Sequence, residues 1–186
     1  MAYDYLGLVN DVNRRLNEVE LTSGNFAAAT GEYSMIKDAV NSAIRYINQH
    51  EYEWPFNHVE AEETLTAGTI RYAYPADAKT LDMDSFRIKR NTTFNNATKR
   101  LRLISYEEYL DKYIDYEYDT DTSIRTLPEY VFRTPNQEFG LVAPPDNAYE
   151  LVYEYYRLPV DLINATDVPS VPEQFRYMIT NGAMHF

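Results

Sequence analysis

Hydrophobic positions near the start of the chain recur every three or four residues, the spacing of one face of an α-helix. Residues Tyr3 to Glu20 carry such a stripe, which predicts an amphipathic helix. A second stripe follows a polar linker, and Ser34 is placed to cap that helix. Pro55 predicts the end of this helix near Trp54, because proline restricts the residue before it and cannot continue the hydrogen-bond ladder.

After Asn57 the hydrophobic period shortens to about two residues, which is typical of strands with one solvated face. Residues 59–66 and 69–74 flank a turn at Ala67-Gly68 and predict a β-hairpin. The later strands are predicted around Phe86 to Ile88, Leu101 to Leu103, Tyr130 to Arg133, Phe139 to Val142 and Tyr149 to Tyr156.

Two further helices are predicted from local signals. Ser105 and Glu108 fit a capping box, so a short helix through about Tyr113 is expected. Pro172 suits the first turn of a last helix, whose apolar stripe reaches Phe186 with no C-cap. We therefore expect either that this apolar end is covered by something else or that more chain follows it.

Taken together, the pattern predicts an α+β fold. Amphipathic helices from both ends of the chain would pack together, and a central, mostly antiparallel β region would form a sandwich or a barrel-like layer. With 186 residues, we expect one structural unit overall. Its parts would be an N-terminal helical part, residues 1–57, a β region with one short helix, residues 58–157, and a loop and helix, residues 158–186, that join the helical part.

Composition narrows the possible functions. Seventeen basic residues against 29 acidic ones give a net charge of −12, which disfavours attraction to a phosphate backbone. The absence of cysteine removes disulfide scaffolds, thiol catalysis and Cys-ligated zinc. No stretch is apolar enough for a membrane span. The 18 tyrosines suit half-buried sheet faces and subunit interfaces more than a dry core.

Chemical motifs are scarce. The three histidines, His50, His58 and His185, form no zinc pattern, and no phosphate, dinucleotide or nucleophile motif is found, so we expect no metal, no cofactor and no enzyme. Trp54-Pro55-Phe56 could form a carbohydrate platform, but we favour a plug between the helical and β layers. The Tyr149 to Tyr156 strand is likewise interpreted as sheet core rather than as a ligand-stacking face.

A set of strings, taken in order, carries a family resemblance. They are Trp54-Pro55-Phe56-Asn57, Tyr74-Pro75-Ala76-Asp77, the run from Leu141 to Tyr156, and Val171 to Tyr177 with Ala183. The chain resembles bacteriophage head-to-tail adaptor proteins, including the tail tubular protein A type of short-tailed phages.

The resemblance implies a virion protein at the head-tail junction, made in the host cytoplasm. It would form a ring of copies of itself, commonly twelve, beneath the portal protein. The ring would continue the DNA channel towards the tail nozzle or tube protein, and packaged DNA would pass without specific binding. No membrane is involved.

Within that framework, some side chains are candidates for two roles. We expect the acidic segment to line the channel as a repulsive wall for DNA, through Asp115, Glu117, Asp119 and Asp121. We expect the portal, a neighbouring copy or the nozzle to contact Phe94, Asn95, Asn96, Phe175, Tyr177 and Phe186. Two competing functions stay open: a carbohydrate-binding or host-recognition module of a tail, and a cell-wall hydrolase that uses two of the many carboxylates.

Overall fold

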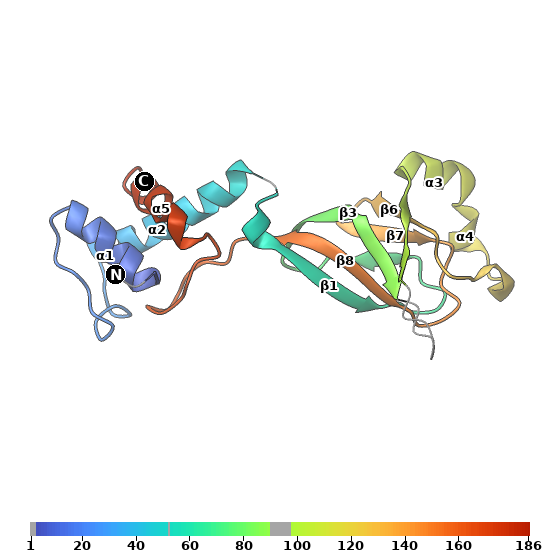
Figure 1. Ribbon diagram of the computed structural model, residues 1–186, viewed down its shortest axis with the longest axis horizontal. Helices are drawn as coiled ribbons and strands as arrows, with labels where there is room; N and C mark the ends of the chain where they lie inside the picture. Colours follow the sequence, from blue (N-terminus) through green and yellow to red (C-terminus); the bar gives the residue numbers. More distant parts are fainter. Residues whose placement is uncertain (1–2, 52, 90–97) are drawn as a thin grey trace. The chain divides into compact units, whose positions relative to one another are not determined.

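The protein is described by a computed structural model that covers residues 3–51, 53–89 and 98–186. Two compact units are present (Figure 1). The helical unit contains residues 1–57 and 158–186, and the β unit contains residues 58–157. The β unit is thus a continuous insertion between the two halves of the helical unit. The predicted α+β class and the packing of the terminal helices are confirmed.

The first helix, α1 (Tyr5–Arg15), is shorter than its hydrophobic stripe predicted. It stops because Asn17 adopts the left-handed conformation, with φ of 61°. The Asn17 N–H donates to the Arg14 carbonyl at 3.3 Å, and the Glu18 N–H donates to the Asn13 carbonyl at 2.8 Å. These two bonds form a Schellman motif, which satisfies carbonyls that the helix end would otherwise leave unpaired.

The second helix, α2 (Glu32–His50), differs from its prediction at both ends. Its N-cap is Gly31, which has φ of 64° and makes no side-chain cap bond, so the prediction that Ser34 caps the helix is wrong. The helix stops at His50, before Trp54. The Trp54 indole N–H donates to the Ile47 carbonyl at 2.9 Å, which satisfies one of the last-turn carbonyls.

The predicted last helix is present as a short 3-10 turn, η3 (Glu173–Phe175), followed by α5 (Arg176–Ala183). Of its predicted apolar stripe, Ile179 and Ala183 are buried, whereas Phe186 is exposed. The core of the helical unit is formed mainly by Leu8, Val9, Val12, Val40, Ile44, Leu162 and Ile179.

Among its described residues, the β unit contains two four-stranded sheets. In the first sheet the order is β1 (His58–Thr64), β8 (Glu150–Arg157), β3 (Ala78–Lys89) and β4 (Thr98–Arg100). In the second it is β2 (Arg71–Ala73), β7 (Glu138–Val142), β6 (Tyr130–Thr134) and β5 (Arg102–Leu103). The strand pairs are antiparallel apart from β5 and β6, so the mostly antiparallel character is confirmed.

The predicted hairpin of residues 59–74 is wrong. β1 pairs with β8 in one sheet, and β2 pairs with β7 in the other. The segment between them crosses from sheet to sheet and finds its hydrogen bonds elsewhere: the Leu65 N–H donates to the Tyr149 carbonyl, and the Gly68 N–H donates to the Pro145 carbonyl, both at 2.8 Å. A turn signal between two strands therefore did not specify their pairing.

Aromatic rings join the two sheets. The ring of Phe139 on β7 lies 5.1 Å from that of Phe86 on β3 and 5.4 Å from that of Tyr153 on β8. The other face of the second sheet is covered by α3 (Tyr106–Lys112), where the Tyr109 ring stacks on Phe132 at 3.8 Å.

The predicted cap of α3 is confirmed, because the Glu108 N–H donates to the Ser105 hydroxyl at 3.1 Å. The remaining short elements are η1 (Pro55–Asn57), α4 (Asp115–Tyr118) and η2 (Thr122–Ile124).

Candidate functional site

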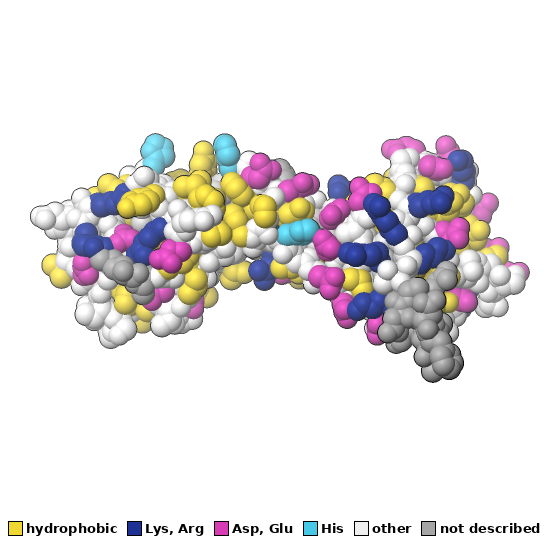
Figure 2. Space-filling view, viewed as in Figure 1, with side chains coloured by type: hydrophobic (Ala, Val, Ile, Leu, Met, Phe, Trp, Pro, Cys, Tyr) yellow, Lys and Arg dark blue, Asp and Glu magenta, His cyan; other side chains and the backbone are white. Residues whose placement is uncertain are grey.

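An apolar groove lies along the helical unit between α1, α2 and the end of α5. It has a volume of about 450 Å³. We call it the terminal groove and define it by its exposed apolar side chains, Leu16, Met35, Met184 and Phe186. Figure 2 shows hydrophobic side chains gathered over α2 and α5. Such a patch in a chain of net charge −12 is typical of a surface that another macromolecule covers.

The structure places the predicted docking residues unequally. Phe186 is 66% exposed, at the rim of the terminal groove, where its ring lies 6.3 Å from that of Tyr46. Tyr177 is 71% exposed. Phe175, in contrast, is half-buried and packs against the helical core. The predictions for Phe94, Asn95 and Asn96 lie outside the described residues.

Tyr177 borders a second hollow of about 700 Å³, which contains several arginines. The guanidinium of Arg15 lies 5.8 Å from the centre of the Tyr177 ring. Arg176 pairs with Asp11 and donates to the Gly7 carbonyl at 3.1 Å. This arginine hollow is also lined by Asp11 and Glu173, and ion pairs with acids use the charge of Arg14 and Arg176.

The four predicted channel acids do not form one group. Glu117 pairs with Arg71 through both carboxylate oxygens, and the Glu117 carboxylate raises the pKa of the Arg71 guanidinium. Asp115, Asp119 and Asp121 are exposed. Hydrogen bonds from Ser123, first from its backbone N–H, lower the pKa of Asp121. The exposed negative charge of the segment therefore comes from the three aspartates.

The aromatic residues that could have formed a carbohydrate platform are largely used in packing. The Trp54 and Phe56 rings stack 5.2 Å apart and pack against the helical core. Tyr153 and Tyr155 on β8 are buried in the core of the β unit, which confirms their interpretation as sheet core.

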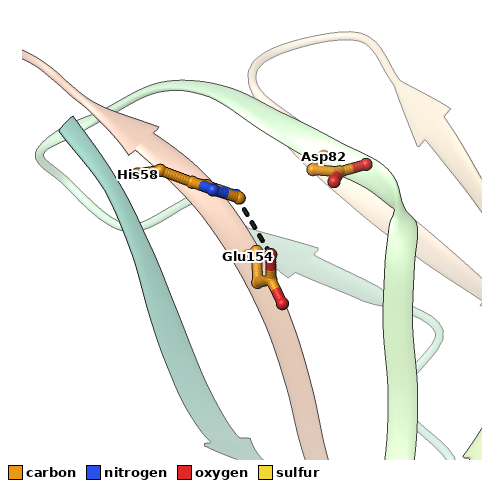
Figure 3. A group of neighbouring side chains, drawn as sticks. All are labelled: His58, Asp82 and Glu154. Carbon is orange, nitrogen blue, oxygen red and sulfur yellow. Dashed lines mark ion pairs between the residues drawn. The ribbon is translucent and has the colours of Figure 1, made fainter. Parts of the chain in front are cut away.

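One side-chain group was not found from the sequence. His58 on β1, Asp82 on β3 and Glu154 on β8 offer ligand atoms that all lie within 4.8 Å of one another (Figure 3). The His58 Nε2 and Glu154 Oε2 atoms are 3.1 Å apart. The three residues are far apart in the sequence, and only the strand register brings them together, so no motif spacing could have revealed them.

These surfaces indicate a class of protein. Among the described residues, apolar and charged patches are exposed, whereas most of the aromatic rings discussed above are buried in the core. This arrangement is typical of a structural component that assembles with other proteins. No helix among the described residues has the length and hydropathy to cross a membrane.

Comparison with known proteins agrees with that class. A family model described as SU10 adaptor protein matches residues 3–186, so the chain belongs to the SU10 adaptor protein family. It is a bacteriophage adaptor, which implies interaction with other head and tail components and a place in the virion. The adaptor class predicted from the sequence is thus confirmed, whereas the tail tubular protein A type stays a prediction. A search of curated proteins finds no match to this chain.

Proposed function

We propose that this adaptor forms a ring between the portal protein and the tail nozzle and continues the DNA channel. The observation that carries the proposal is the terminal groove, where Phe186 and its apolar neighbours are exposed to solvent in the isolated chain. Assembly would bury this surface, and the hydrophobic effect would supply a driving force of about 25 cal/mol per Å².

The charge of the chain bears on when the ring forms. Twelve chains of net charge −12 would carry about −144 together, so mutual repulsion opposes association of free subunits. We infer that the protein stays monomeric until it docks on the portal, which holds the copies close enough for the grooves to engage. Arg15 of the arginine hollow would then accept an acidic group of a neighbour.

Native mass measurement of the purified protein, with and without its portal, tests this. We expect a monomer alone and a multimer only with the portal. Phe186→Ala should weaken assembly by about tenfold or more, as expected for a buried aromatic anchor. Tyr118→Ala is the matched control, because Tyr118 is 76% exposed on α4, in the other unit, and should leave assembly unchanged. A chain that never joins the portal would overturn the proposal.

The channel role is assigned to Asp115, Asp119 and Asp121 rather than to Glu117, whose carboxylate is used by Arg71. Changing all three aspartates to Asn should leave ring formation intact and increase retention of DNA in the assembled complex, because the repulsive wall is lost. The measurement is DNA release at low and moderate salt. A particle structure with these side chains on the outer rim would contradict the assignment.

A further inference from the structure

The His58, Asp82 and Glu154 group lies in an unfavourable row of like charges. Glu154 on the central strand β8 stands directly opposite Glu60 on β1 and opposite Asp82 on β3. Carboxylates directly opposite each other on neighbouring strands have Cβ atoms about 5 Å apart and destabilise a sheet. The ion pair of Arg87 with Glu154 offsets part of this repulsion. Three acids therefore cross three adjacent strands of the β unit at one level.

His58 reaches the same row diagonally. It pairs with Tyr156, two residues beyond Glu154, so its side chain shares the Glu154 face of the sheet. The imidazole stacks on the Tyr156 ring, with centroids 4.5 Å apart and planes 10° apart. This stacking holds the ring with Nε2 towards Glu154, and Figure 3 shows the three side chains on one side of the sheet.

The contact between His58 and Glu154 has the length of an ion pair. Nε2 and Oε2 are 3.1 Å apart, yet Nε2 is buried and has no hydrogen-bond partner among the described residues. Two ligand atoms that share one tetrahedral zinc ion at bond lengths of about 2.0–2.2 Å lie about 3.3 Å from each other. The 3.1 Å separation thus fits two atoms that face a common cation as well as it fits an ion pair, and the Asp82 carboxylate lies within 4.8 Å of both atoms.

The surrounding groups fix both carboxylates. Arg87 Nη2 donates to Glu154 Oε1 at 2.9 Å, which leaves Oε2 for the site. Asp82 Oδ1 accepts the Asp84 N–H at 3.0 Å. The backbones are tied through Ser85, whose hydroxyl donates to the Asp82 carbonyl at 2.6 Å and accepts the Glu154 N–H at 2.7 Å. Ligands in metal sites are commonly oriented by such outer hydrogen bonds.

We propose that His58, Asp82 and Glu154 bind a divalent transition-metal ion, with zinc as the best fit. One imidazole and two carboxylates suit Zn²⁺, whereas Mg²⁺ and Ca²⁺ prefer oxygen ligands alone. Water would complete the coordination. The ion would cancel the charge of the two carboxylates and cross-link β1, β8 and β3 where the chain enters and leaves the β unit. This inference is independent of the ring proposal.

Calorimetric titration of the full, chelator-treated chain with zinc chloride tests the site. We expect saturable binding of one ion per chain and a higher melting temperature with zinc. Co²⁺ should give the visible absorption of a tetrahedral or five-coordinate site. In His58→Gln and in Glu154→Gln, zinc affinity should fall by at least about tenfold.

The matched control is His50→Gln, because His50 is an exposed histidine of the helical unit and its loss should leave zinc binding unchanged. Two results would overturn the proposal: a wild-type chain with no saturable zinc binding up to about 1 mM, or equal affinity in the wild-type and His58→Gln chains. The first result is measured on the wild-type chain alone, so the test remains decisive even if a variant folds poorly.

Discussion

The helical and β units reach a buried core by different means. In the helical unit, buried asparagines bind the backbone of segments distant in the sequence. Asn10 exchanges two hydrogen bonds with the backbone of Leu21, at 2.8 and 2.9 Å, and Asn41 does the same with Leu162, both at 3.0 Å. In the β unit, stacked aromatic rings fill the space between and outside the sheets.

The difference shows what holds each unit. Loops cross the helical unit, and a buried loop is stable only if its backbone N–H and C=O groups are paired, which the asparagines achieve. The β unit pairs its backbone groups within the sheets. The packing of its core therefore depends on how closely the aromatic rings approach the strand backbone. Every member of the helical core cluster lies in the helical unit, and both β clusters lie in the β unit.

Gly140→Ala should produce the largest effect and test whether the units unfold separately. A Cβ at Gly140 would lie 2.1 Å from a ring atom of Phe132, which α3 holds in place. We expect a loss of about 3 kcal/mol in the free energy of unfolding of the β unit. Urea unfolding followed by far-UV circular dichroism measures both units, whereas fluorescence of Trp54, the single tryptophan, reports the helical unit.

We expect the dichroism transition to move and the Trp54 transition to stay. Gly24→Ala is the control, because the nearest atom to its added Cβ is 3.9 Å away. Adding Phe132→Leu to Gly140→Ala should recover part of the loss, since the smaller side chain relieves the overlap. Equal shifts of the dichroism and fluorescence transitions would mean that the two units unfold together.

Asn41→Ala should have a smaller effect, confined to the helical unit. It leaves the buried N–H and C=O of Leu162 without their side-chain partner, which costs about 2 kcal/mol. The Trp54 fluorescence transition should move to lower urea concentration. Gln49→Ala, on an exposed position of the same helix, should leave it in place. An unchanged transition in Asn41→Ala would show that the hydrogen bonds between Asn41 and Leu162 do not stabilise the helical unit.

Glu63→Gln should change the free energy of unfolding least, and it should stabilise the protein rather than destabilise it. Burial raises the pKa of Glu63, with a weaker opposing contribution from the Tyr153 hydroxyl. Because the folded chain holds the proton to higher pH than the unfolded chain, stability falls as pH rises through the window between the two values. The variant should match wild type in acid and be more stable at neutral pH, by less than about 0.5 kcal/mol. Thermal melts across this window measure the difference, and a variant less stable at pH 7 would contradict it.

The sequence predicted the helices and strands better than it predicted which strands pair with each other. Helical stripes and the Ser105 cap are local signals, and they predict α1, α2, α3 and α5. The stripe does not predict the end of α1, which depends on the left-handed conformation of Asn17. Strand alternation identified β6, β7 and β8 and the buried face of Tyr153. Alternation says which face is buried but not which strand lies alongside, so the 59–74 hairpin was assigned wrongly.

The candidate sites follow the same rule. The exposure of Phe186 could be anticipated from an apolar stripe without a cap, because that signal is local. The pairing of Glu117 with Arg71 depends on a contact 46 residues distant in the chain, and the His58, Asp82 and Glu154 group depends on the register of three strands. Neither contact can be predicted from the spacing of residues that are close in the sequence.

The insertion of the β unit within the helical unit sets an order for biogenesis. A ribosome completes residues 58–157 before it begins residues 158–186, which supply Leu162 and Ile179 to the helical core. The β unit can therefore fold during translation, whereas α1 and α2 must wait for the last segment to emerge. Subunits released early by a stalled ribosome would carry a finished β unit but no α5, and so would lack the Met184 and Phe186 side of the terminal groove.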